Sequence, residues 1–345
     1  MAQSELQRPP WQTAVAPYAR PDTRRAFVDV LTAVVPYLAL TVAMFALVDV
    51  SYPLALALAV PTAGFLTRTF LVMHDCAHGS FLSSRRANHW LGVLTGLITL
   101  QTFHCWRHDH IRHHAAGGDL AADGTGDVEI LTVAEYRGLP PRQRLAYRLR
   151  RDPFVVFGIG ALYANVIKPR IVLRSDPPPL RRAKLATDLA LAAMLVAVGW
   201  LAGWRELLVV GFPTFWLASG FGVWLIWVQH RFEGALWQSP PDWDWETAAL
   251  AGSSHFKLPR ALQFFSLNIG LHHVHHLNPR IPNYNLSRAN DENEFLRAVP
   301  TVSLLDGIKA VRLCLYDVER GRLVTFAQAR GSYTRTNGIG AARSL

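Results

Sequence analysis

The sequence is short of charged residues, since only 17% of its 345 residues are Asp, Glu, Lys or Arg. Soluble domains carry about 25% charged residues, so this shortage argues against an ordinary soluble enzyme. The composition also excludes a disordered, highly charged chain. Cysteine is scarce as well, with three residues at widely separated positions. Three scattered cysteines exclude a disulfide framework and a metal site made of thiolates.

Lysine is the third scarcity, because only four of the 35 basic residues are Lys and the rest are Arg. This arginine bias suggests a bacterial protein. The formal net charge is nevertheless +10, and a basic, apolar chain indicates either a membrane protein or a nucleic-acid-binding protein. The sequence contains no zinc finger, recognition helix or aromatic stacking platform. We therefore expect no nucleic-acid partner.

Four long apolar stretches are present, and a membrane-spanning helix needs about 20 such residues. They come in two close pairs, with very short separators at Asp49-Val50 and Arg205-Glu206. We therefore expect two transmembrane helical hairpins rather than the long buried helices of a soluble protein. The four expected spans cover residues 28–48, 51–73, 185–204 and 207–229.

The distribution of positive charge predicts the orientation of these hairpins. Twelve basic residues lie between Arg137 and Lys184, whereas the two separators contain only Arg205. Positively charged loops remain in the cytosol, so we expect both termini and the 137–184 segment on the cytosolic side. The first 26 residues lack the apolar core of a signal peptide. The expected divisions are a cytosolic N-terminal segment over 1–26, a membrane domain over 27–320 and a C-terminal tail over 321–345.

Two further apolar stretches, 90–103 and 153–167, are shorter than a span. Their length favours buried or interfacial helices. The segment 117–126 is rich in Gly and Asp and is expected to form a loop. The expected fold is therefore all-α and integral to the membrane, with interfacial helices and a cytosolic helical cap.

Histidine is frequent, and eleven of the 14 histidines fall in the windows 74–78, 104–114 and 272–276. His74 and His78 in the first window have the i, i+4 spacing that places both rings on one helix face. The second and third windows each repeat an i, i+3, i+4 pattern, which again shares one face. The members of these two patterns are His110, His113, His114, His272, His275 and His276.

These eight imidazoles exceed the four ligands of a tetrahedral zinc ion and suit two metal ions. Imidazole binds iron, copper, zinc or nickel, so the ligands alone leave the metal open. Because 90–103 is too short to span, the first two windows can meet on one side of the membrane, and two later spans return the third window there. Asp75 and Asp109 lie within the windows and are expected to accept hydrogen bonds from ligand rings. A metal beside apolar helices favours chemistry on a lipid-like molecule.

The order and spacing of these windows resemble those of the membrane fatty acid desaturases, in particular the bacterial and cyanobacterial acyl-lipid branch. The resemblance covers residues 27–320. It implies that His230 is a ninth ligand, although from the sequence alone His230 could be a helix-terminal histidine that faces lipid headgroups. The motifs that carry it, besides the histidine windows, are Arg68–Phe81, Trp106–His114, Thr125–Val128, Val228–Glu233, Gly252–Ser254 and Asn268–Tyr284.

The resemblance implies two Fe ions as cofactors, O2 as co-substrate and the desaturation of a fatty acyl chain linked to a lipid. The fatty acyl chain of the substrate would lie in an apolar tunnel between the helices and the cap. The alternative is a hydroxylase or ketolase that acts on a lipid or carotenoid with the same metal site. No haem, flavin or ferredoxin-type motif is present, so a separate ferredoxin or flavodoxin is expected to supply electrons.

The basic 137–184 segment could dock that electron carrier or hold anionic lipid. The active site is expected on the cytoplasmic face of a bacterial inner membrane. His273 and Asn268 adjoin the third window and are expected to contact the ligands rather than the metal, while His104 and His108 are out of register with the HxxHH pattern. Four glycines of the spans are expected to permit close helix packing or approach of the substrate chain. They are Gly64, Gly211, Gly220 and Gly222.

Overall fold

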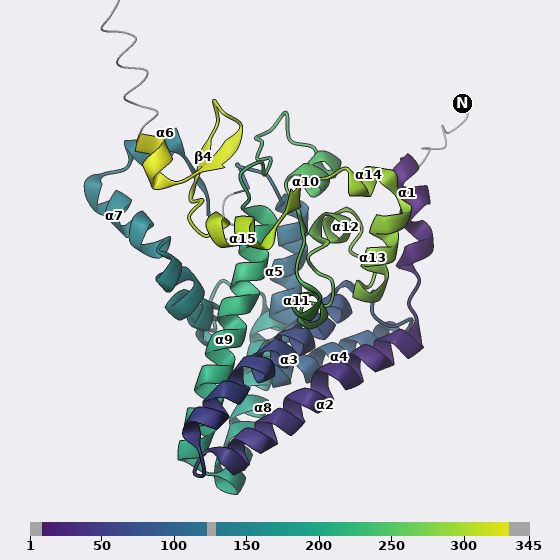
Figure 1. Ribbon diagram of the computed structural model, residues 1–345, viewed down its shortest axis with the longest axis vertical. Coiled ribbons are helices and arrows are strands. Elements are labelled where there is room, and N and C mark those ends of the chain that lie inside the picture. The colour runs from purple at the N-terminus through teal and green to yellow at the C-terminus, as the bar shows by residue number, and fades with distance from the viewer. Residues whose placement is uncertain (1–8, 123–128, 331–345) are drawn as a thin grey trace, which may run out of the picture.

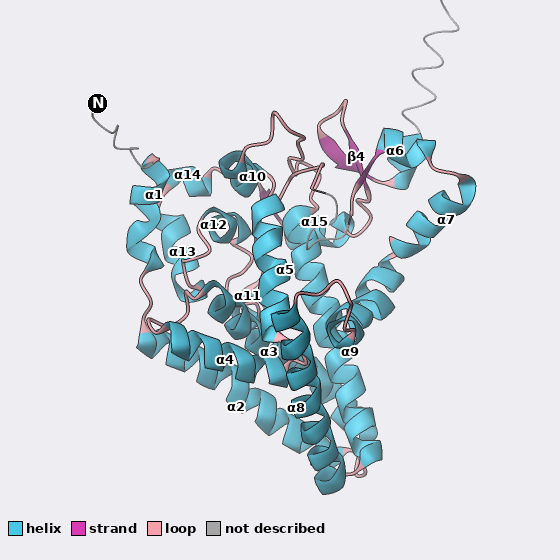
Figure 2. Cartoon of the chain, turned by 180° about the vertical axis from the view of Figure 1, so that it is seen from behind, coloured by secondary structure: helices cyan, strands magenta, loops and turns pink. Residues whose placement is uncertain are grey.

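The computed structural model describes residues 9–122 and 129–330 of the chain and is mostly helical (Figures 1 and 2). Its described residues contain four helices that are long and apolar enough to cross a membrane. The two expected transmembrane hairpins are thus confirmed, and the protein is a membrane protein. The four helices are α2 (Thr23–Leu47), α3 (Tyr52–His78), α8 (Pro178–Ala202) and α9 (Trp204–His230).

Local sequence determines where these helices begin and turn. Asp22 caps α2 by accepting hydrogen bonds from the backbone amides of Arg24 and Arg25 at 2.9 and 3.1 Å. The residue after α3 is Gly79, whose φ of 67° costs glycine no strain. An ion pair of 2.6 Å between Asp49 and Arg205 joins the tips of the hairpins. Both hairpins therefore turn at the same end of the bundle, the lower end in Figure 1.

Two of the spans lie inside the bundle and two lie outside. α3 packs against α2, α9 and α4 (Arg85–Ile98), and 56% of its most apolar window is buried, against 11% for α2 and α8. The outer helices expose large apolar side chains such as Val42, Leu189 and Leu201. Apolar side chains that face outward along a whole helix suit surrounding lipid.

The two shorter apolar stretches do not cross the bundle, as expected. The first forms α4, which is followed after a four-residue turn by α5 (Phe103–Ala116). The second forms the π-helical turns η2 (Val155–Gly160) and η3 (Tyr163–Ile167), which lead into the 3-10 turn η4 (Lys168–Arg170). η2 packs against α9.

The cap covers the end of the bundle opposite the hairpin tips (Figure 1). It is helical, as expected, and consists of many short helices in addition to α5. They are α1 (Pro10–Val15), η1 (Ala16–Ala19), α6 (Val133–Gly138), α7 (Pro141–Arg150), α10 (Trp245–Ala251), α11 (Arg260–Phe265), α12 (His272–Leu277), α13 (Asn283–Glu292), α14 (Glu294–Arg297) and α15 (Leu304–Ala310).

The described part of the cap also contains five short strands that the sequence did not predict. β4 (Leu315–Asp317) pairs parallel with β1 (Leu131–Thr132) and antiparallel with β5 (Arg322–Val324). β2 (His255–Phe256) pairs parallel with β3 (Thr301–Val302). Strands of two or three residues are too short to produce a recognisable alternation of apolar and polar residues.

Both ends of the described chain belong to the cap. Val15 and Tyr18 are buried, and the Tyr18 hydroxyl donates a 2.6 Å hydrogen bond to Glu292 in α13. At the other end, Val324 in β5 is fully buried, so the packed chain extends beyond the expected boundary at residue 320. The rest of the expected tail from residue 331, the end of the expected 117–126 loop and the Thr125–Val128 motif lie outside the described residues.

Candidate metal centre

The first two ligand candidates come from the last turns of α3. His74 and His78 are one turn apart, and their ring centroids are separated by 5.0 Å. Nδ1 of His74 lies 2.9 Å from a carboxylate oxygen of Asp75. The other oxygen of Asp75 accepts hydrogen bonds from the backbone and side-chain amides of Asn283 at 2.7 and 3.0 Å. Asp75 therefore fixes the His74 ring and leaves Nε2 to face the site.

α5 contributes three histidines on its buried face. His110, His113 and His114 are all buried. The Trp106 ring stacks on the His110 ring, with centroids 4.3 Å apart. Phe70 of α3 in turn packs edge to face against Trp106, with ring centroids 5.3 Å apart. These aromatic contacts hold the His110 ring in place.

α12 is six residues long, and all six are buried. The chain enters it through Leu267 and Asn268, whose φ angles are 45° and 59°. Asn adopts this left-handed conformation more readily than most residues. Gly270 follows, where a Cβ would lie 2.4 Å from the carbonyl oxygen of Phe256, so only glycine lets the chain pass β2. This tight turn directs the histidines of α12 towards those of α3 and α5.

His230 ends α9 and joins the same cluster. Its Nδ1 lies 3.3 Å from the carbonyl oxygen of Gly252. Because a carbonyl can only accept, Nδ1 carries the proton and Nε2 presents a lone pair. That lone pair faces Nε2 of His113 at 3.1 Å and Nε2 of His272 at 2.9 Å.

Close pairs of ring nitrogens recur across the cluster. Nε2 of His114 lies 3.1 Å from Nε2 of His110 and 2.9 Å from Nε2 of His275. Two nitrogens bound at right angles to one metal, with bonds of about 2.1 Å, lie about 3.0 Å apart. The observed spacing is therefore that of nitrogens around a shared ion.

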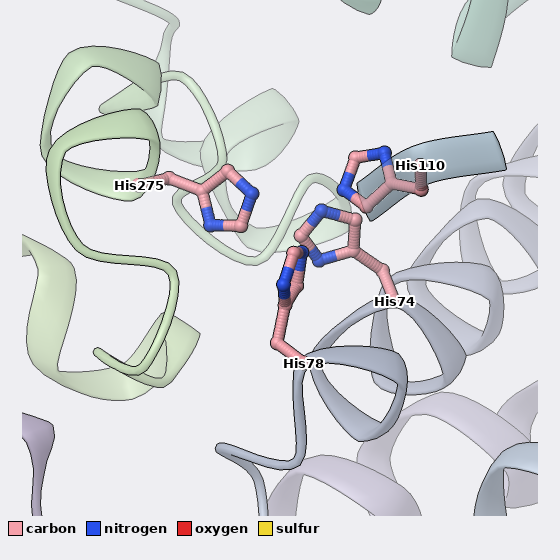
Figure 3. Close-up of side chains that lie close together, drawn as sticks. All are labelled: His74, His78, His110 and His275. Carbon is pink, nitrogen blue, oxygen red and sulfur yellow. The ribbon is translucent and has the colours of Figure 1, made fainter. Parts of the chain in front are cut away.

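The histidines form two groups of four, and within each group the ligand atoms all lie within 4.8 Å of one another. Figure 3 shows the first group, in which His74 and His78 project from one helix while His110 and His275 approach from other elements. His114 lies between the groups, since its ring also stacks on His276 at 4.2 Å. All nine histidines predicted as ligands are thus brought together. The second group consists of His113, His230, His272 and His276.

Burial favours the neutral form of five of these rings. Burial, followed by the proximity of other histidines, holds the pKa of five histidines of the cap well below its usual range. A neutral imidazole has a lone pair for a metal. Nε2 of His78 and Nε2 of His276 are buried without a hydrogen-bond partner, which costs free energy that a bound cation would offset. The residues with lowered pKa values are His110, His114, His272, His275 and His276.

Three residues expected to support the ligands are placed elsewhere. Asp109 lies on the exposed face of α5 and contacts His108 at 3.2 Å, because one residue of helix turns it about 100° away from His110. Nε2 of His273 lies 3.3 Å from Asn290, so this ring is directed towards α13, and burial lowers its pKa to about 4. Asn268 shapes the backbone turn before α12. His104 and His108 lie outside both groups.

Asn283, Trp106 and Gly252 were not predicted from the sequence, although they hold Asp75, His110 and His230 in place, respectively. Each lies within a motif of the family resemblance. Their contacts join segments as far apart as Asp75 and Asn283, and such contacts leave no trace in the spacing of residues along the chain.

A buried ion pair joins α2 to α3 one and a half turns before His74. Arg68 lies 2.7 Å from a carboxylate oxygen of Asp29 and donates a hydrogen bond to Thr32 at 3.1 Å. It also donates to the carbonyl oxygen of Phe264 in α11, and its guanidinium carbon lies 4.1 Å from the centroid of the Phe264 ring. Arg68 thereby connects an outer helix, an inner helix and the cap.

A cavity of about 170 Å³ adjoins the histidines, and its wall includes His74, His110 and His272, one from each window. Most of the remaining wall is apolar and comes from α3 and α9. Five polar side chains of the wall, those of Thr67, Thr99, Gln101, Asn165 and Gln229, donate to backbone carbonyls, for example Gln101 to Asn165 at 2.8 Å and Gln229 to Ile269 at 2.9 Å. An apolar cavity whose polar groups are already satisfied suits a hydrocarbon chain.

Known proteins resemble this chain along most of its length. A fatty acid desaturase of Bacillus subtilis is 41% identical over 90% of this chain and 89% of its own length. Two proteins of Synechocystis sp. are each 29% identical: an sn-1 oleoyl-lipid 12-desaturase, over 66% of this chain and 65% of its own length, and an sn-1 acyl-lipid omega-3 desaturase (ferredoxin), over 64% and 62%.

These names confirm the expected enzyme class, an oxidoreductase that desaturates fatty acyl chains, and do not favour a hydroxylase or ketolase. The sequence model described as "Fatty acid desaturase" matches residues 49–301. That match and the Bacillus relative show that the chain belongs to the fatty acid desaturase family.

Proposed function

We propose that this protein desaturates acyl chains carried by membrane lipids, at a centre of two iron ions held by nine histidines. The observation that supports it most directly is the cavity whose wall contains His74, His110 and His272. A hydrocarbon chain in this cavity would lie against histidines of both groups. No Asp, Glu, Lys or Arg side chain is among the described residues that line it, so it favours an uncharged chain over a water-soluble substrate.

The first group, with His114, would hold one iron ion, and the second group would hold the other. Bound iron supplies the activation of dioxygen and the removal of two hydrogens from neighbouring carbons of the chain. Asp75 and the Gly252 carbonyl hold the protons of His74 and His230 on Nδ1, which keeps both Nε2 atoms available as ligands. Trp106 orients His110 and lines the cavity, where it excludes water.

We propose that a separate acidic carrier, a ferredoxin or a flavodoxin, supplies the electrons, since one similar protein has ferredoxin in its name. α7 bears four arginines within ten residues. Arg148 is engaged by the Tyr136 hydroxyl and the Phe326 ring, whereas Arg142 and Arg150 are exposed. The same surface could hold anionic lipid. Reversing the charge of Arg142 and Arg150 should slow turnover with the carrier and leave membrane binding unchanged, and unchanged turnover would contradict docking at α7.

We also propose that the cap faces the cytoplasm at a bacterial inner membrane. The hairpin tips carry Arg205 as their single basic residue, while the 137–184 segment carries twelve. This asymmetry supports a cytoplasmic cap.

The function is tested by expressing the chain in a host that lacks polyunsaturated fatty acids and analysing the fatty acid methyl esters. New double bonds are expected, while oxygenated products would instead support the hydroxylase or ketolase. The purified protein should hold roughly two iron ions per chain, and one zinc ion would contradict the proposal. His110→Ala should abolish the product and lower the iron content. His104→Ala, on the same helix but outside both groups, should change neither.

A further inference from the structure

We infer that Gly222 determines how far an acyl chain extends past the histidines, and thereby which carbons are desaturated and which chain lengths are accepted. The inference rests on the proposed function and names a specificity-determining residue of the same site. Gly222 lies in α9 and lines the cavity, as does Gln229 seven residues later. At 1.5 Å per residue, this places Gly222 about 10 Å along the helix from Gln229.

α9 presents one continuous face to the cavity, because its lining residues recur every three or four positions. His230, in the second histidine group, follows directly after the last of them. The further a lining residue precedes His230 along α9, the further it lies from the histidines along the cavity. The main residues of this face are Phe215, Ala218, Ser219, Gly222, Val223, Ile226 and Gln229.

The space at Gly222 is the central observation. A Cβ added there would meet no atom within 4 Å, and since the residue lines the cavity, a longer side chain would grow into that cavity. Gly220 is different, because a Cβ there would lie 2.6 Å from the carbonyl oxygen of Phe157. Close packing of η2 thus accounts for Gly220 and leaves Gly222 unexplained.

Backbone conformation does not account for Gly222 either. It lies inside a regular helix, where glycine is less favourable than alanine. The advantage of glycine at this position is therefore the volume that it leaves open in the cavity.

The part of the cavity beyond Gly222 suits the methyl-terminal end of an acyl chain. On α9 it is lined by Phe215, Ala218 and Ser219, and on α3 by Leu66 and Thr67. Thr67 donates its hydroxyl proton to the carbonyl oxygen of Ala63 at 3.0 Å. The end of an acyl chain that carries no ester or carboxylate matches this wall. Gly222 then limits how many carbons lie between the histidines and the methyl group.

The test compares product structure for Gly222→Ala and Gly222→Leu in the expression host described above. A larger side chain shortens the methyl-terminal pocket, so carbons nearer the methyl end should face the histidines and the new double bond should move in that direction. Longer acyl chains should lose product relative to shorter ones, by on the order of tenfold for each methylene that no longer fits. Gly222→Ala should shift the products in the same direction and by less.

Gly211→Leu is the matched control. Gly211 also lies in α9, and a Cβ there also meets no atom within 4 Å, but the residue does not line the cavity. This variant should keep the double-bond position and chain-length preference of the natural protein. Iron content and membrane yield, measured for every variant, report whether the chain is folded.

Unchanged products from both Gly222 variants at normal iron content would overturn the inference, as would a shift of the double bond towards the carboxyl end. If Gly222→Leu fails to fold, Gly222→Ala decides alone, because alanine favours the helix. If the natural protein forms no new double bond at all, the proposed function fails and the inference fails with it. If the natural protein forms new double bonds and the Gly222 variants form them at the same positions, the inference is refuted and the proposed function stands.

Discussion

The inner and outer helices of the bundle have nearly the same lengths but use their residues differently. α2 and α8 expose apolar side chains along most of their surface, whereas α3 and α9 are the more buried partners of each hairpin. The inner helices carry His74, His78 and His230 at their cap ends and line the cavity with their middle turns. The comparison teaches that anchoring and chemistry are assigned to different members of each hairpin.

Replacing His230 should have the largest effect, because it tests whether an inner helix supplies a ligand. His230→Ala removes Nε2 from the second group, so desaturation should become undetectable and the iron content should fall by about half or more. Iron analysis and fatty acid profiles of the same preparation measure both. Full iron content and normal activity would show that His230 only ends α9 and that the inner helices contribute less than proposed.

Breaking the contact between an outer and an inner helix should have the next largest effect. Asp29→Ala leaves the buried Arg68 guanidinium without its carboxylate, which should lower the free energy of unfolding by about 3–5 kcal/mol. Thermal unfolding of the protein in detergent measures the change. Arg205→Ala removes the exposed pair at the hairpin tips and should leave stability unchanged. Equal effects of the two substitutions would contradict the importance of burial.

A smaller effect is expected from the residue that orients an inner-helix ligand. Asp75→Asn keeps the size of the side chain but loses the negative charge that faces Nδ1 of His74. Such partners typically change metal affinity by about 10–100-fold. Iron affinity can be followed by competition with a chelator, and an unchanged affinity would mean that Asn283 and the helix position His74 without the carboxylate.

The sequence predicted the features that depend on periodicity and length. The two hairpins followed from apolar runs and short separators, and eight of the histidines from i, i+3 and i+4 spacing on helix faces, while His230 was expected only from the family resemblance. His104 and His108, which are out of register with the HxxHH pattern, lie outside both groups, since a residue out of register turns away from the shared face. These predictions succeed because each depends on a regular local geometry.

Features that depend on contacts between distant segments were not predicted. Asp109 lies beside His110 in sequence but faces solvent, and Asn268 forms a turn rather than a contact with a ligand. The sheet that β5 completes arises only when distant elements meet in space. For the same reason, no local pattern distinguishes Gly222, which faces open space, from Gly220, which packs against Phe157.

The hydrogen bond between Tyr18 and Glu292 has a consequence for the order in which the protein matures. The two residues are separated by almost the whole described chain, so the segment made first waits for a partner made near the end. At about 5–20 residues per second, that delay is on the order of tens of seconds. The histidines of α3 likewise wait for those of α12. Loading of the proposed iron ions would therefore follow the insertion of both hairpins, and metal limitation during growth would leave a complete, membrane-embedded protein whose histidines are already assembled.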